Sequence, residues 1–205
     1  MYTRTSAKAK TRKLTMLSLL CAMIVVLQLI PTFFGATLPF TLALTPIIIG
    51  AALYGWREGA FLGFFFGLVC FLYAIFGWDA FTGGLLQFNF VVTVLLCFLK
   101  GAAAGAVAGL LYHPIARKNK TVAAFACGAA APIVNTGIFA LGMLTVLRGF
   151  LNDFTVSMNG GNPVVFLFVG LISVNFFIEL GSNLLLGATV ARLLDYYKKK
   201  NGITD

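Results

Sequence analysis

Residues Phe88–Tyr112 read FNFVVTVLLCFLKGAAAGAVAGLLY, an apolar run whose single charged side chain is Lys100. About 20 consecutive apolar residues are enough for a helix to cross the hydrocarbon core of a bilayer. This run is long enough, and we therefore predict that it forms a transmembrane helix. Similar apolar runs recur along the rest of the chain, so the whole protein is predicted to lie in a membrane.

The overall composition supports the same conclusion. Of the 205 residues, 60% are hydrophobic and 10% are charged, and the mean hydropathy is +0.97. A soluble domain carries about 25% charged residues, because water must wet its surface. We therefore predict an all-α membrane protein in which a single integral membrane domain, residues 1–205, forms a bundle of six transmembrane helices. The predicted spans are 14–30, 41–55, 58–76, 88–112, 121–147 and 164–194, of which the second is short for a crossing.

The basic residues predict how the bundle is oriented. The formal net charge is +9, and with the N-terminus inside, every Lys and Arg except Lys100 and Arg148 belongs to the cytoplasmic side. Cytoplasmic loops carry an excess of Lys and Arg, so both termini are predicted to be cytoplasmic (N-in/C-in). The loops 31–40, 77–87 and 148–163 then face outward. Because the basic residues flank apolar runs, no nucleic-acid partner is expected.

Small residues recur at regular intervals in three predicted spans. Glycine appears every four residues in two of them, at Gly59, Gly63 and Gly67 and at Gly101, Gly105 and Gly109. This interval keeps the glycines on one helix face, where a neighbouring backbone can approach closely. We expect packing within the bundle, and the alternative is a docking surface for another subunit. Ser18 and Ala22 form a shorter pair of the same kind in the first span.

Polar side chains inside the predicted spans are candidates for ligand contact, because ionisable groups within a bilayer are costly. Lys100 lies near the middle of its span, as does Asn135. Asn175, Glu179 and Asn183 follow one another at intervals of four and therefore share a helix face. These groups could bind a substrate, or Lys100 and Glu179 could pair while the asparagines bond across helices. Further candidates on the outer side are Gln87, Asn89 and Thr41.

The sequence contains no recognisable catalytic constellation. The four cysteines are scattered singly through apolar runs, which does not favour a metal site or a redox motif. His113 has no carboxylate cluster nearby in the sequence, and no phosphate-binding loop for ATP hydrolysis is present. We therefore expect neither an enzyme nor a bound metal or cofactor.

Three stretches carry a family resemblance: TRKLTMLSLLCAMIVVLQL (Thr11–Leu29), LALTPIIIGAALYGWREGAFLGFFFG (Leu42–Gly67) and FLKGAAAGAVAGLLY (Phe98–Tyr112). They resemble the first, second-to-third and fourth helices of the substrate-binding S components of energy-coupling factor (ECF) vitamin transporters. The resemblance implies a subunit of the bacterial plasma membrane that binds a vitamin near its extracellular face. It also implies a membrane-embedded coupling (T) subunit and two cytosolic ATPase subunits as partners. The small-residue patch that contacts the coupling subunit in this family corresponds to Ser18 and Ala22.

The polar residues favour an anionic ligand within that class. A single cation at mid-span suits a carboxylate, and several amide side chains suit hydroxyl or amide groups. Pantothenate carries all of these groups and is the first candidate, while riboflavin, folate, cobalamin or another vitamin remain open. The competing hypothesis is a self-sufficient secondary transporter or channel, in which Lys100 and Glu179 would couple transport to an ion.

Overall fold

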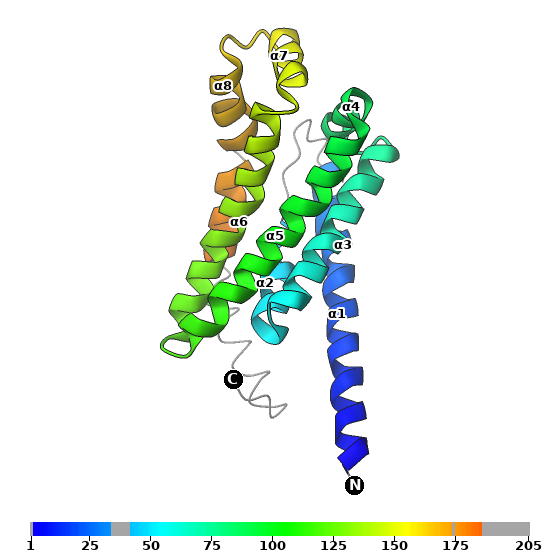
Figure 1. Ribbon diagram of the computed structural model, residues 1–205, viewed down its shortest axis with the longest axis vertical. Coiled ribbons are helices and arrows are strands. Elements are labelled where there is room, and N and C mark those ends of the chain that lie inside the picture. Colours follow the sequence, from blue (N-terminus) through cyan, green and yellow to red (C-terminus); the bar gives the residue numbers. More distant parts are fainter. Residues whose placement is uncertain (1, 34–41, 174, 186–205) are drawn as a thin grey trace.

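The computed structural model describes residues 2–33, 42–173 and 175–185, and every regular element in this part of the chain is a helix. Figure 1 shows the long helices running side by side in one elongated bundle. The predicted all-helical fold is therefore confirmed. The elements are α1 (Tyr2–Phe33), α2 (Leu44–Tyr54), α3 (Trp56–Ile75), α4 (Ala80–Phe88), α5 (Phe90–Ala116), α6 (Lys120–Leu144), α7 (Arg148–Ser157), α8 (Pro163–Val165) and the π-helix η1 (Phe166–Ile172).

Five helical segments are long and apolar enough to cross a membrane. They are Ala9–Ile30, Trp56–Ile75, Phe90–Ala116, Lys120–Leu144 and Pro163–Leu185, and the last is called the final helix below. The second predicted span, 41–55, is not among these five segments. Its helix α2 has 11 residues, which at about 1.5 Å per residue cover roughly half of the hydrocarbon core. The prediction of six full-length transmembrane helices is therefore supported for five of them.

The short helix α2 is enclosed by protein. Leu44, Ile47 and Ala51 are fully buried, and α2 contacts α1, α3, α5 and α6. An apolar helix normally signals contact with lipid, but the same composition also describes a helix buried in the middle of a bundle. Hydropathy alone does not separate these two cases, which explains the difference from the prediction.

Two of the predicted outer loops contain helices. α4 occupies most of the loop 77–87, and α7 lies within the loop 148–163. Neither is long enough to cross a bilayer, and each buries one face: Phe81 and Leu85 in α4, Leu151 and Thr155 in α7. Phe81, Leu85 and Leu151 belong to a hydrophobic cluster that also includes residues of α6 and the final helix. Short amphipathic helices of this kind escape a search for long apolar runs.

The two glycine ladders face each other across α3 and α5, which lie side by side in Figure 1. A methyl group added to Gly63 would lie 2.0 Å from the carbonyl oxygen of Gly101, and one added to Gly105 would lie 2.0 Å from that of Gly59. Both distances are far below van der Waals contact, so only glycine allows the two backbones to approach this closely. The ladders therefore serve packing within the bundle, as expected, and the alternative of a docking surface for another subunit is wrong.

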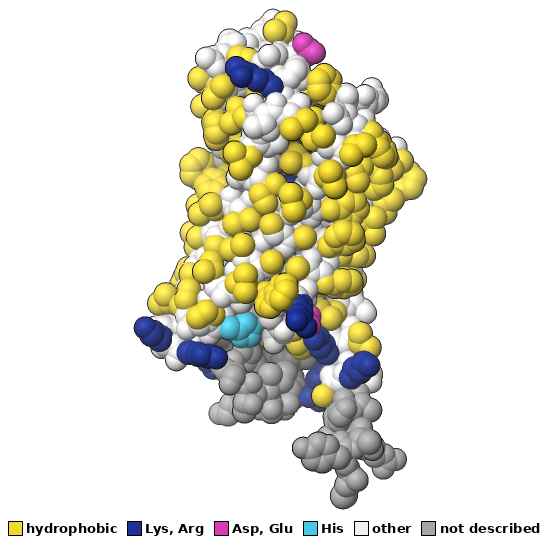
Figure 2. Space-filling model, viewed as in Figure 1, with side chains coloured by type: hydrophobic (Ala, Val, Ile, Leu, Met, Phe, Trp, Pro, Cys, Tyr) yellow, Lys and Arg dark blue, Asp and Glu magenta, His cyan; other side chains and the backbone are white. Residues whose placement is uncertain are grey.

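Positive charge gathers at the end of the bundle where α1 begins, while hydrophobic side chains cover much of the face shown in Figure 2. Lys13 of α1 forms an ion pair with Glu58 at the start of α3 and lies over the ring of Tyr54. This contact places the starts of α1 and α3 at the same end. Large apolar side chains on the outer surface, such as Leu95 and Leu99, are more than half exposed. Such a surface is suited to lipid, and the chain is a membrane protein.

Candidate ligand-binding site

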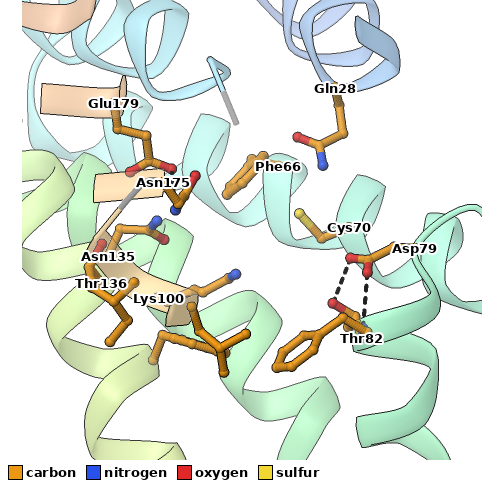
Figure 3. A pocket seen from close by; sticks show the side chains of 14 residues that line it. Gln28, Phe66, Cys70, Asp79, Thr82, Lys100, Asn135, Thr136, Asn175 and Glu179 are labelled. Carbon is orange, nitrogen blue, oxygen red and sulfur yellow. Dashed lines mark hydrogen bonds between the residues drawn. The ribbon is translucent and has the colours of Figure 1, made fainter. Parts of the chain in front are cut away.

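A cavity lies between the two hydrophobic cores of the bundle. One core joins α1, α2, α3, α5 and α6, and the other joins α4 and α7 to α6 and the final helix. The cavity is lined by residues of both: Phe66 and Cys70 from the first core, and Phe81 from the second. It therefore lies in the half of the bundle nearer α4 and α7, away from the basic end. Six helices contribute to the lining, and Figure 3 shows its polar side chains.

Lys100 extends from α5 into this cavity (Figure 3). Its ammonium nitrogen lies 5.6 Å from the centre of the Phe139 ring, a cation–π contact. Within the described part of the chain, the ion pair of Lys13 with Glu58 is the only one formed at 4.0 Å or less. Lys100 therefore has no carboxylate of the described residues in direct contact, and the pairing with Glu179 considered from the sequence is not formed.

Glu179 reaches the same cavity from the final helix and is fully buried. Its Oε1 accepts a hydrogen bond of 3.2 Å from Asn175 Nδ2, one helical turn earlier, as the four-residue spacing predicts. Its Oε2 is buried and has no hydrogen-bond partner among the described residues. A buried carboxylate oxygen without a donor is unfavourable, so the cavity holds an acceptor that a ligand or water can satisfy.

Asn183 shares the face of Asn175 and Glu179 but has a structural role. Its Nδ2 donates to the carbonyl oxygen of Glu179 at 2.8 Å, and its Oδ1 accepts from the Thr45 hydroxyl at 2.8 Å. The second bond joins α2 to the final helix. Asn183 does not line the cavity, and it fixes the position of the helix that carries Glu179.

Two further polar atoms come from consecutive residues of α6. Asn135 is 4% exposed, and its Oδ1 and the Thr136 Oγ1 are buried without a hydrogen-bond partner in the described structure. Both residues line the cavity, and in Figure 3 they lie on the same side of it as Glu179. Native proteins satisfy the great majority of their buried polar groups. Three unsatisfied atoms in one place therefore indicate a site built for a polar group.

Asp79 and Thr82 line the opposite side of the cavity (Figure 3). Asp79 is the N-cap of α4, where its Oδ1 accepts from the Thr82 backbone N–H at 3.0 Å and its Oδ2 accepts from the Thr82 hydroxyl at 2.6 Å. Both oxygens are thus engaged in starting the helix, a common role for Asp. In the described lining, Glu179 is therefore the carboxylate with an oxygen that has no hydrogen-bond partner.

Comparison with known proteins relates the chain to components of transporters. The family described as ECF transporter, substrate-specific component, matches residues 12–191. The chain belongs to this family. A pantothenic acid transporter, PanT, from Lactococcus lactis subsp. cremoris (strain MG1363) is 41% identical over 71 residues. The match covers 33% of this chain and 36% of that relative, and no solved structure matches the chain. The family and this relative are transporter components and not enzymes.

Four residues predicted from the sequence meet at the cavity of this S component: Lys100, Asn135, Asn175 and Glu179. The others lie elsewhere. Asn89 is the N-cap of α5 and accepts from the Val92 N–H at 3.2 Å, while Gln87 is exposed near the end of α4. Thr41 lies outside the described residues. Ser18 and Ala22 are both exposed on α1.

The structure adds residues that the sequence prediction missed. Gln28, Asp79, Thr82 and Thr136 line the cavity. Gln28 is a polar residue within the first span, so the rule that selected Asn135 could have found it. Asp79 and Thr82 lie in a segment predicted as a loop, and their position follows from α4, which the hydropathy pattern does not reveal.

The space available in the cavity is small. The centre of a water molecule can occupy about 60 Å³ of it, room for a few waters at roughly 10–15 Å³ each. A vitamin has many more atoms than that. A ligand of that size would therefore need the lining residues to shift, and α4 is a short helix among those that line the cavity.

Proposed function

We propose that this S component captures pantothenate from outside the cell and delivers it to a coupling subunit and two ATPases. The observation that carries the proposal is the Lys100 ammonium, which lines the cavity and, among the described residues, has no carboxylate in contact. A buried cation binds a carboxylate strongly, because little water competes. Pantothenate has one carboxylate, and a relative that matches part of this chain is named as a transporter of pantothenic acid.

The alternative vitamins fit the charges of the cavity less well. Riboflavin has no carboxylate and would leave Lys100 without a partner. Folate ends in two carboxylates, whereas Lys100 is the one cation in the described lining. Cobalamin is several times larger than pantothenate and would require much greater widening of the cavity. Membership of the S component family also favours substrate capture over a self-sufficient secondary transporter or channel.

Calorimetric titration of the purified chain tests the proposed substrate. We expect pantothenate to bind in the nanomolar range or tighter without any partner, and panthenol, in which CH2OH replaces the carboxylate, to bind about 100-fold more weakly. The S component alone should suffice, because the cavity is formed within one chain. Equal affinity for the two compounds would contradict the role of the carboxylate, and binding of neither would contradict the proposed substrate.

We also propose that the bundle crosses a bacterial plasma membrane six times, with both termini inside. Lys13 pairs with Glu58, so α1 and α3 start at the same end, and the chain must return through the bilayer between them, with α2 as part of this return. The basic end would be cytoplasmic by the positive-inside rule.

In a background without native cysteines, Asp153→Cys should react with an impermeant maleimide in intact cells. Lys118→Cys should react only after permeabilisation, and the opposite pattern would contradict this topology.

ECF S components work with coupling and ATPase modules, and we propose that the exposed face of α1 contacts the coupling subunit. Ser18 and Ala22 are small and exposed, and close helix approach in membranes uses such residues. Ser18→Leu and Ala22→Leu should each reduce copurification with coexpressed coupling and ATPase subunits by about tenfold without changing pantothenate affinity. Ser18→Ala, which keeps the side chain small, is the matched control. Normal copurification of both leucine variants would show that another face makes the contact.

A further inference from the structure

We infer that the cavity binds its ligand in one orientation, with the carboxylate at Lys100 and hydroxyl groups against an acceptor cluster formed by Asn135, Thr136 and Glu179. This inference rests on the proposed function and extends it to the residues that select the substrate. It follows from the way opposite charges and unsatisfied atoms are distributed around one cavity. In Figure 3 the amine of Lys100 lies between this cluster and the Asp79 side.

The acceptor cluster is defined by three buried atoms that lack a hydrogen-bond partner in the described structure: Asn135 Oδ1, Thr136 Oγ1 and Glu179 Oε2. The amide oxygen of Asn135 and an ionised carboxylate of Glu179 accept, and the threonine hydroxyl can accept or donate. Asn135 and Glu179 are 4% and 0% exposed, so bulk water does not reach them freely. A group that brings hydrogen-bond donors therefore complements this side of the cavity.

Electrostatics then fix which end of the ligand goes where. A carboxylate is attracted to Lys100 and repelled by an ionised carboxylate on Glu179 or Asp79, and these interactions are stronger in a buried site than in water. On the other side of the cavity, each carboxylate oxygen of Asp79 already accepts a hydrogen bond from Thr82, whereas the three atoms of the acceptor cluster have no partner in the described structure. Hydroxyl groups of a carboxylated ligand therefore have their best partners at the acceptor cluster. This arrangement selects a hydroxylated acid over an acid of the same shape without hydroxyls.

The test compares pantothenate with N-(3,3-dimethylbutanoyl)-β-alanine, which keeps the carboxylate and the amide but lacks both hydroxyls. Thr136→Val removes the hydroxyl while preserving shape, and Glu179→Gln replaces one carboxylate oxygen by an amide nitrogen, which is a donor. Each should weaken pantothenate binding by about tenfold and change binding of the analogue by less than about twofold. Thr136→Ser, which restores the hydroxyl, should bind pantothenate like the wild type.

Thr145→Val is the matched control, because Thr145 is exposed at the end of α6 and its hydroxyl donates to the carbonyl of Leu141. It should bind both compounds like the wild type, and melting curves of every variant show that the fold is intact. The inference would be overturned if the variants lost the same affinity for both compounds. It would also be overturned if neither Thr136→Val nor Glu179→Gln weakened pantothenate binding. If pantothenate still binds and depends on Lys100 in that case, the proposed function stands. Failure of the wild type to bind pantothenate would overturn both.

Discussion

Replacing Lys100 with methionine is expected to weaken pantothenate binding by the purified chain about 100-fold, or roughly 3 kcal/mol. The ammonium lines the cavity, and no carboxylate of the described residues is in contact with it, so the ligand would supply its counter-ion. Methionine has a similar length but no charge, and it leaves the carboxylate of the bound ligand without a partner in a buried site. Titration calorimetry measures the loss directly.

The stability of the same variant separates binding from folding. Removing a lysine from a buried ion pair destabilises the fold, because it leaves the partner carboxylate unpaired. Lys100 forms no such pair with the described residues, and removing its charge also removes the cost of burying it. Without ligand, Lys100→Met should therefore melt at or above the temperature of the wild type. A marked loss of thermal stability would indicate that Lys100 serves the fold.

Lys118→Met is the control for the loss of a positive charge. Lys118 lies in the turn between α5 and α6, outside the cavity. The substitution removes the same formal charge from the chain as Lys100→Met does. Its affinity for pantothenate should equal that of the wild type. Panthenol, which lacks the carboxylate, should bind Lys100→Met and the wild type alike.

Substituting alanine for Gly63 is expected to lower the free energy of unfolding by about 3 kcal/mol. The new methyl group would lie 2.0 Å from the carbonyl oxygen of Gly101 and 2.9 Å from the backbone nitrogen of Ala102. Both are main-chain atoms and cannot rotate away, so α3 and α5 must separate. For a chain of this size the melting temperature should fall by about 6–12 °C, as measured in detergent.

Whether a Gly→Ala substitution raises or lowers stability shows whether the glycine lies against a neighbouring backbone. Alanine is a better helix former than glycine by about 1 kcal/mol, so a glycine without close neighbours should gain stability from the same change. Gly137 in α6 is such a position, because a methyl group there would meet no atom within 4 Å. Gly137→Ala should therefore melt at or above the wild-type temperature. If Gly63→Ala also melts at or above the wild-type temperature, that result would contradict the close contact between α3 and α5.

The α3–α5 contact also positions the candidate site. Lys100 immediately precedes Gly101, and Phe66 lies one turn after Gly63, and both side chains line the cavity. Separating the two helices would move these groups relative to each other. Gly63→Ala should consequently weaken pantothenate binding as well as stability.

Part of this arrangement could be read from the sequence because it depends on local periodicity. Intervals of four residues place glycines on one face, and the same interval places Asn175 beside Glu179. The depth of Lys100 and Asn135 within apolar runs marked them as candidates, and the structure brings all of these polar groups to one cavity. None of these inferences required knowledge of which helices are neighbours.

The remainder depends on tertiary contacts that periodicity does not encode. α2 is as apolar as a membrane span, yet it is too short to cross and is enclosed by other helices. Asn89 and Asn183 are polar residues near candidate groups, and they bond to backbone or to another helix. Asp79 reaches the cavity because α4 folds back over the bundle. Distinguishing a ligand contact from a cap or a link between helices requires the positions of the partner atoms.

Native mass spectrometry of the wild-type chain and of Lys100→Met, both purified from cells grown in rich medium, would show whether Lys100 holds a pantothenate molecule in the cavity. We expect the wild type to retain one molecule of pantothenate through purification and Lys100→Met to carry none. A wild-type chain that retains a vitamin without a carboxylate, or a Lys100→Met chain that retains pantothenate as fully as the wild type, would contradict it.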